Sequence, residues 1–301
     1  MGSDILGHYS TTASRSASVV IGSYSTSFGL ACWLLGRKER QDIENIYALV
    51  RVADEVVDGA AEAAGLCPTE VEAQLDGLER ETEHALKIGY STNMVVHAFA
   101  GTARRCSIGV ELTRPFFASM RTDLAQHSHS PESLKDYIYG SAEVVGLMCL
   151  AVFETMDGAT AGQNNIQLTE SARSLGAAFQ KVNFLRDLGA DSTDLGRLYF
   201  PGLDPSAFND GHKLALLADI RHDLEVARWG IPLLAPRARL AVRMAHNLFL
   251  ALVVKLERVP AAELVTRRIR VPGYQKAYIA LGACAGPWHQ RSTTSVQESG
   301  L

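Results

Sequence analysis

The chain has 301 residues, 47% of them hydrophobic and 21% charged, which is the balance of a globular protein that can bury a sizeable core. Its formal net charge of −4 argues against a general nucleic-acid binder, because phosphate contacts require clustered Lys and Arg. The 5 cysteines include no C-x-x-C pair, so we expect reduced thiols in a cytoplasmic protein and no cysteine-based metal site.

The two ends of the chain are polar. Residues 1–17 lack the apolar segment of a signal peptide and are expected to be a flexible N-terminus, and residues 286–301 a flexible tail. The longest strongly apolar run, Val144–Phe153, is about half as long as a membrane-spanning helix. We therefore expect a soluble chain, with contact at a membrane surface left open.

Apolar residues recur at helical spacing through almost all of the chain between these ends. A first stripe begins at Ile43, and Ser130-Pro131 has the form of a helix start. No alternating strand pattern is present. The breaks are short, so residues 18–285 are predicted to form a single all-α domain, with later helices near 70–86, 94–106, 112–127, 131–156, 169–188, 212–228, 237–258, 260–269 and 272–284.

Two aspartates end the first predicted helix. Asp54 and Asp58 are four residues apart, about one turn along one face, and Arg51 precedes them on nearly the same side. Stacked carboxylates repel each other unless a cation lies between them. Mg²⁺ prefers oxygen ligands together with phosphate, so it suits this spacing. A solvated acidic face is the plainer interpretation of this motif taken alone.

A second Asp pair with the same spacing occurs late in the long predicted helix 169–188 and just beyond it. Gln180, Asn183, Asp187 and Asp191 share one stripe between apolar neighbours. A polar stripe on an apolar helix is costly unless something satisfies it. Arg186 adds a cation suited to phosphate. Two such walls would clamp metal-bound diphosphates, with a set of salt bridges as the alternative.

Two further segments carry groups suited to anions. Tyr24, Ser25 and Ser27 belong to a hydroxyl-rich segment that is either an anion site or a helix cap. Arg197 and Tyr199 follow the second Asp pair in a G-R-L-Y-F-P loop that could fold over it.

Taken in order, these motifs resemble the squalene/phytoene synthase family of head-to-head prenyl transferases. The matching strings include Y-S-T-S-F, R-V-A-D-E-V-V-D, M-R-T-D-L, N-F-L-R-D-L-G-A-D and G-R-L-Y-F-P, and the resemblance covers about residues 20–280. It implies an isoprenoid-synthase helical bundle around a central cavity. The strings G-S-A-E and F-Q-K-V-N-F-L are most similar to bacterial phytoene synthases.

The resemblance also implies roles for individual residues. Mg²⁺, or Mn²⁺ in its place, would be bound by Asp54 and Asp58 on one wall and by Asn183, Asp187 and Asp191 on the other. The aspartates and Arg186 would be catalytic. Substrate diphosphate would be contacted by Tyr24, Ser25, Ser27, Tyr47, Arg51, Gln180, Asn183, Arg186, Arg197, Tyr199 and Arg268.

The reaction implied by the resemblance joins two geranylgeranyl diphosphates into phytoene through a cyclopropyl diphosphate, in carotenoid biosynthesis. A phytoene synthase would need no nicotinamide. Some positions depart from the family's commonest pattern. Glu55 and Ala190 stand where Asp and Glu are frequent. Gly140 and Glu143 stand where Tyr and Gly are common, and Leu248 where a Tyr is expected.

Three alternatives stay open on the sequence. Squalene or dehydrosqualene synthesis from the C15 diphosphate would use the same motifs. Prenyl transfer to a non-prenyl acceptor would fit the altered Gly140 and Glu143. A helical interaction protein without activity is disfavoured, because both Asp motifs are intact. The sequence does not fix the oligomeric state.

Overall fold

The computed structural model describes residues 2–126, 128–159, 165–194, 199–202 and 207–265, and in these ranges every regular element is helical. The all-α prediction is therefore confirmed. In chain order the elements are α1 (Gly2–Tyr24), α2 (Thr26–Cys32), α3 (Arg37–Val57), α4 (Ala60–Ala63), α5 (Pro68–Ile88), α6 (Met94–Arg105), α7 (Val110–Ala125), α8 (Pro131–Ile138), η1 (Tyr139–Glu143), α9 (Val144–Glu154), α10 (Asn165–Asp194), α11 (Asp210–Gly230), η3 (Ile231–Leu233), α12 (Pro236–Arg258) and α13 (Ala261–Leu264).

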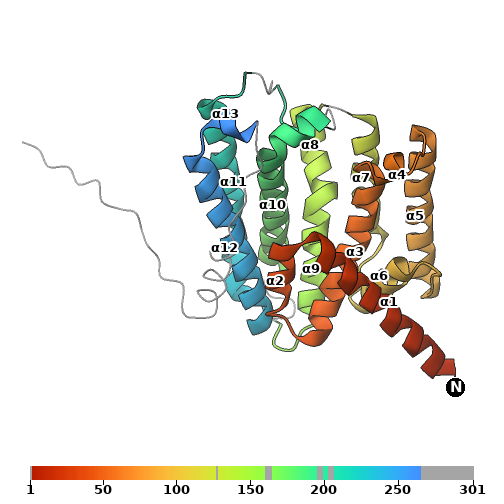
Figure 1. Cartoon of the computed structure of the whole chain (residues 1–301). Coiled ribbons are helices and arrows are strands. Elements are labelled where there is room, and N and C mark those ends of the chain that lie inside the picture. The colour runs from red at the N-terminus through yellow and green to blue at the C-terminus, as the bar shows by residue number, and fades with distance from the viewer. Residues whose placement is uncertain (1, 127, 160–164, 195–198, 203–206, 266–301) are drawn as a thin grey trace, which may run out of the picture.

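The long helices stand side by side, with α9 and α10 in the middle of the bundle (Figure 1). Apolar residues of α3, α6, α7 and α9 form one core, in which Ile46, Phe99 and Phe117 are fully buried. A second core joins α10 to α11 and α12 through residues such as Leu185 and Ile220. Helix α3 of the first core carries Asp54, and helix α10 of the second carries Asp187.

Helix α10 touches α9 and η1 backbone to backbone at two glycines. A Cβ atom added to Gly146 would lie 2.4 Å from the carbonyl oxygen of Ala172, and one added to Gly176 would lie 2.5 Å from that of Ala142. Real Cβ atoms do not approach oxygen so closely, so only glycine allows this packing. These contacts fix the position of α10 relative to α9 and η1.

A π-helical turn, η1, interrupts the helical run Pro131–Glu154 at Tyr139–Glu143. Such turns are rare and occur often at functional sites. By length and apolarity this run is the one helix among the described residues that could cross a membrane, and half of its most apolar window is buried. Core helices of soluble proteins pass the same test, and here the run packs against α3, α7 and α10.

The N-terminal segment differs from the prediction. Residues 1–17 were expected to be flexible, whereas α1 is a helix that packs on α3 and α6. Among its described side chains the fully buried ones are Ala13, Ala17 and Ile21, and the Tyr9 hydroxyl donates to the Ser91 carbonyl oxygen at 3.0 Å. So narrow a stripe among Ser and Thr gives little hydrophobic signal.

The other predicted helices are confirmed where the structure describes them, although several differ in extent. The helix predicted at 169–188 is Asn165–Asp194. The first predicted helix begins at Arg37 rather than Ile43, and the helix predicted at 260–269 is the single turn Ala261–Leu264, as far as it is described. The predicted helix 272–284 and the tail 286–301 lie outside the described residues.

Candidate active site

A cavity of about 990 Å³ lies between α3 and α10 and is also lined by α2, η1, α9, α11 and α12. It brings together residues that are far apart in the sequence. Of the predicted site residues, those lining it are Tyr24, Ser25, Tyr47, Arg51, Asp54, Asp58, Gln180, Asn183, Arg186, Asp187 and Tyr199.

The cavity has a polar and an apolar end. The polar end, which we call the mouth, is formed by Asp54, Asp58 and Asp187 with their cationic neighbours, near the C-terminal ends of α3 and α10. The apolar end, the floor, includes Leu168 and Leu234. Along α10 the lining runs from Asp187 to Leu168, 19 residues or about 28 Å at the helical rise.

The α3 side of the mouth is a cluster of charged residues around Arg51. Its Nη1 lies 4.0 Å from Asp54 Oδ2, and its Nη2 pairs with Glu55. Its Cζ lies 4.5 Å from the ring centre of Tyr24, a cation–π contact, while its buried Nε has no hydrogen-bond partner. This guanidinium therefore has a donor to spare for an anionic ligand.

Asp54 and Asp58 lie where a helix is least favourable to carboxylates. Asp58 is the C-cap of α3, and its backbone N–H donates to the Asp54 carbonyl oxygen at 2.8 Å. The C-terminal end of a helix carries partial negative charge, which destabilises nearby carboxylates and attracts cations. These positions therefore favour a bound cation for a reason that the sequence spacing alone did not give.

The opposite wall carries the second motif on α10. Gln180, Asn183 and Asp187 all face the cavity. Arg186 donates from Nε to Asp187 Oδ1 at 2.9 Å and from Nη2 to Oδ2 at 2.5 Å, a two-point ion pair. Each wall thus holds an arginine paired with a carboxylate. A guanidinium in such a pair can bind a diphosphate in place of the carboxylate.

The residues present fit a metal that binds through few protein ligands. Among the described side chains no three Asp, Glu, His or Cys residues converge on a single point. Mg²⁺ is commonly held by one or two carboxylates together with substrate phosphates and waters. Carboxylates on two facing walls match that pattern, with the diphosphate as the shared ligand.

Tyr47 lies one helical turn before Arg51 in α3 and is half-buried in the cavity wall. Burial raises the pKa of its phenol, and Asp54 adds to this, while Arg51 and a hydrogen bond with Ser25 act in the opposite direction. The phenol therefore stays protonated and can donate a hydrogen bond to an anion.

A buried carboxylate that the motif analysis left without a role lies beside this site. Asp123, 7% exposed, accepts hydrogen bonds from the Tyr137 hydroxyl at 2.7 Å and the Tyr199 hydroxyl at 3.4 Å. Burial, then Asp123, raises the pKa of Tyr137 well above 10. The ring of Tyr199 stacks on Phe184 with 4.0 Å between centres. The sequence signal that could have identified Asp123 is the presence of a carboxylate in the M-R-T-D-L segment of a partly buried helix.

The structure shows where three of the residues that depart from the family pattern lie. Glu143 turns away from the cavity and pairs with Arg173, whose Nε lies 2.6 Å from Glu143 Oε2. Gly140 is packed so closely that an added Cβ would lie 2.2 Å from the Pro115 carbonyl oxygen. Leu248 lines the cavity where a phenol was expected. None of these places a charge among the apolar lining.

Four predicted residues are not placed by the structure. The side chains of Ser27 and Asp191 lie outside the described residues, although both positions are helical. Arg197 and Arg268 lie outside the described residues altogether. The side chain of Ala190, one of the departures from the family pattern, is also not described. Their assignments stay predictions.

Comparison with known proteins agrees with this geometry. The family model of squalene/phytoene synthase matches residues 21–275. A phytoene synthase from Arthrospira platensis is 32% identical over 210 residues, 66% of each chain. A 4,4'-diapophytoene synthase from Staphylococcus haemolyticus is 28% identical over 193 residues, 63% of this chain and 62% of its own.

The fold is similar to that of a dehydrosqualene synthase whose crystal structure holds a ligand. The TM-score is 0.71 at 20% identity, over 91% of this chain and 96% of that one. The match spans 42% to 66% of the length of four phytoene synthases that are similar in sequence. The fold, the two facing Asp motifs and the extent of the family match lead to one conclusion: the chain belongs to the squalene/phytoene synthase family of head-to-head prenyl transferases.

Proposed function

We propose that this protein is a Mg²⁺-dependent phytoene synthase, which joins two geranylgeranyl diphosphates. One observation carries the proposal: carboxylates and arginines on two facing helices stand at one end of a cavity whose other end is apolar. A molecule with a diphosphate head and a long hydrocarbon tail is complementary to both ends.

The residues of the mouth would bind and ionise the diphosphate. Arg51 and Arg186 neutralise its charge as it leaves, and the Tyr47 phenol donates to its oxygens. Mg²⁺, or Mn²⁺, held by Asp54, Asp58, Asn183, Asp187 and Asp191, would supply Lewis-acid stabilisation of the leaving group. Departure of the diphosphate leaves an allylic cation at the top of the apolar lining.

The apolar lining keeps water from that cation. The double bond of the second substrate then attacks it, giving a cyclopropylcarbinyl diphosphate, with the lost proton passing to the released diphosphate. A second ionisation and rearrangement give a linear cation, which loses a second proton to the released diphosphate to form the neutral product. Tyr137 and Tyr199, held by Asp123, fix one side of this space.

The depth of the cavity supports the C20 substrate. An extended geranylgeranyl chain has 16 main-chain carbons and is about 19 Å long, taking bonds of about 1.5 Å. The α10 lining is longer than this, and small residues such as Ala172 and Gly176 line its middle. The C15 chain also fits, and the Staphylococcus relative is named for a C30 product, so diapophytoene or squalene-type synthesis is the second candidate.

The proposal includes a cytoplasmic location and no nicotinamide. Incubating the protein with Mg²⁺ and the C20 diphosphate, then extracting products, tests it directly. We expect phytoene and two equivalents of diphosphate, and loss of both when EDTA is added. Product from the C15 diphosphate but none from the C20 diphosphate would select the second candidate, and no diphosphate release from either would refute both.

A further inference from the structure

The floor of the cavity is formed by two segments that also form the outer surface at that end. In residues 31–36 Ala31, Cys32 and Leu35 line the cavity, and in residues 229–235 Gly230, Ile231 and Leu234 do so. Each segment contains one of the two tryptophans of the described residues. Trp33 is 71% exposed and Trp229 is 62% exposed, each next in sequence to a residue of the floor.

The same surface is rich in basic residues. The segments 33–40 and 229–240, which we call the basal face, hold five Lys and Arg against one Glu, a net charge of 5 − 1 = +4 in a chain whose total is −4. Adding the neighbouring end of α9, with Glu154 and Asp157, leaves 5 − 3 = +2. The basic residues are Arg37, Lys38, Arg40, Arg237 and Arg239.

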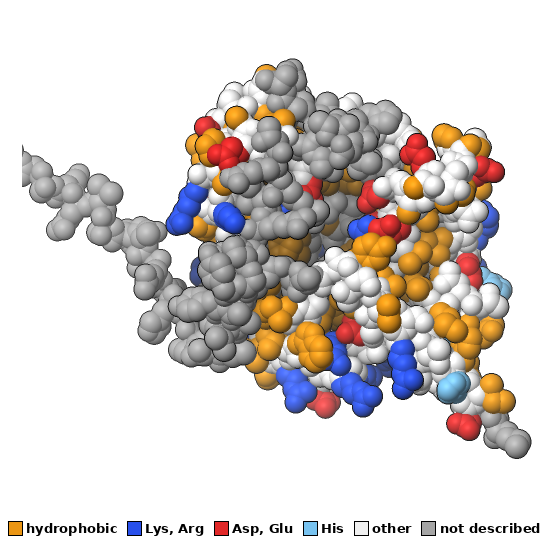
Figure 2. Space-filling model, viewed as in Figure 1, with side chains coloured by type: hydrophobic (Ala, Val, Ile, Leu, Met, Phe, Trp, Pro, Cys, Tyr) orange, Lys and Arg blue, Asp and Glu red, His pale blue; other side chains and the backbone are white. Residues whose placement is uncertain are grey.

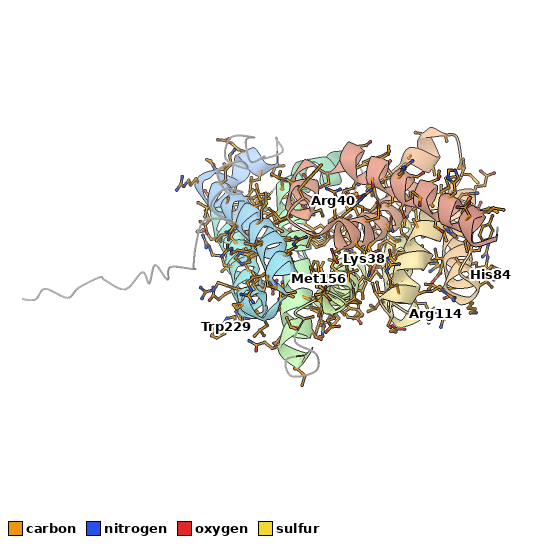
Figure 3. All side chains as sticks on the ribbon, turned by 90° about the horizontal axis from the view of Figure 1, so that it is seen from below. Lys38, Arg40, His84, Arg114, Met156 and Trp229 are labelled. Atoms are coloured by element: carbon orange, nitrogen blue, oxygen red, sulfur yellow. The ribbon has the colours of Figure 1, made fainter. Side chains whose placement is uncertain are left out.

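The two segments meet in space. A Cβ atom added to Gly36 would lie 3.3 Å from Arg237 Nη1, so the start of α12 reaches the α2–α3 turn. Arg40 Cζ lies 4.5 Å from the centre of the Trp33 ring and supports that side chain at the surface. Figure 3 looks onto this end, with Lys38, Arg40 and Trp229 in view, and Figure 2 shows Lys and Arg side chains along its lower edge.

Exposed tryptophans beside lysines and arginines match the chemistry of a lipid surface. Trp partitions to the boundary between headgroups and acyl chains, and basic residues are attracted to anionic headgroups. A nucleic acid would also attract the cations but offers nothing for the apolar floor behind them. The floor is the deepest part of a cavity suited to a hydrocarbon chain. A lipid bilayer against this face would therefore extend the apolar surroundings of the cavity.

We propose that the basal face docks on an anionic lipid bilayer, with Trp33 and Trp229 entering the headgroup region and Arg37, Lys38 and Arg237 contacting the headgroups. Docking would bring the floor of the cavity against the acyl chains, opposite the mouth through which diphosphates enter. The mouth then stays in water while the product end faces lipid.

Flotation of the full chain with vesicles tests the docking. We expect binding to vesicles of phosphatidylcholine with about 30% phosphatidylglycerol and little binding to vesicles of phosphatidylcholine alone. Salt on the order of a few hundred mM should weaken the binding to the anionic vesicles. The double variant Arg37→Glu/Lys38→Glu should bind at least about tenfold more weakly. Trp33→Ser/Trp229→Ser should lose binding to a similar extent.

The matched control is Arg80→Glu/Lys135→Glu, which makes the same charge change at exposed positions on α5 and α8. It should bind as the wild type does. Leu214→Ser, an exposed apolar residue on α11, controls for the tryptophans. Thermal unfolding of every variant shows whether each is folded. Absence of vesicle binding by the wild type, or equal loss in the control pair, would overturn the proposal.

A turnover measurement extends the test and rests on the proposed function. Anionic vesicles should raise the multiple-turnover rate of the wild type several-fold, leave its single-turnover rate unchanged, and do neither for Arg37→Glu/Lys38→Glu. Absence of any product in all samples would count against the proposed function, whereas flotation would still decide the docking.

Discussion

The mouth and the floor of the cavity are built in different ways. The mouth consists of long charged side chains, Arg51, Arg186 and Asp187, held by ion pairs at the ends of two helices. The middle and the floor depend on backbone position: Gly146 and Gly176 bring α9 and η1 against α10, and an added Cβ on Gly230 would lie 2.5 Å from the Ser171 Cβ. Chemistry is thus set by side chains, and the space for the substrate by close backbone contacts.

This difference predicts that substitutions at the mouth and at the floor have different effects, and the largest effect on activity is expected at the mouth. Asp187→Ala removes a carboxylate of the α10 wall and the partner of Arg186, so kcat should fall at least about 10³-fold, as expected when a charge-stabilising group is lost. Diphosphate release measures this. The melting temperature should change little, because the residue lines the cavity rather than a core.

Asp219→Ala is the control for that change. Asp219 is 56% exposed on α11 and accepts from Lys181 Nζ at 2.5 Å, on the outer side of α10. Its removal should leave kcat within about twofold, because an exposed ion pair contributes little. Near-wild-type activity of Asp187→Ala would show that the assignment of the α10 motif is wrong.

The next effect lies in the backbone contact. Gly176→Ala places a methyl group 2.5 Å from the Ala142 carbonyl oxygen, so η1 and α10 must separate and the protein should lose about 1–3 kcal/mol of stability. Gly101→Ala, within α6, meets nothing within 4 Å and should gain about 0.5–1 kcal/mol, because Ala is the better helix former. Chemical denaturation compares the two, and the same sign for both would contradict this account.

A third prediction concerns the space above the floor. Val242 lies six residues into α12, about 9 Å from its start, and lines the cavity. Val242→Phe should raise the ratio of kcat/KM for the C15 over the C20 diphosphate by about 10–200-fold, since the longer chain loses its room. Leu214→Phe, exposed on α11, should leave the ratio unchanged. An unchanged ratio in Val242→Phe would place the end of the substrate elsewhere.

The sequence predicted the mouth better than the floor, for physical reasons. Carboxylates four residues apart on an apolar helix show themselves by spacing, and both Asp motifs face the cavity as far as their side chains are described. A glycine needed for close approach has no pattern of its own. Gly140 was identified only as a departure from the family pattern, Gly146 was not identified, and their partners, Pro115 and Ala172, are distant in sequence.

The orientation of Glu143 was equally beyond the sequence. The π turn at Tyr139–Glu143 places an extra residue in one turn, so spacing arguments based on 3.6 residues fail across it. Glu143 consequently pairs with Arg173 outside the cavity, and the residues of this turn that line the cavity are Ser141 and Ala142. Helix α1 was missed for another reason, since its buried stripe is mostly alanine.

Ser141 provides the smallest and most specific test. Its buried Oγ lies in the cavity wall without a hydrogen-bond partner, whereas Ser119 Oγ donates to the Tyr137 carbonyl oxygen at 3.1 Å. A buried hydroxyl without a partner costs about 1–3 kcal/mol, so Ser141→Ala should leave stability unchanged or raise it by about 1 kcal/mol. Ser119→Ala removes the bond that is made and should lower stability by about 1 kcal/mol. Denaturation of both variants gives the comparison. Destabilisation by Ser141→Ala equal to that by Ser119→Ala would mean that Ser141 has a partner in solution, and that the wall of the cavity is more polar than its lining residues indicate.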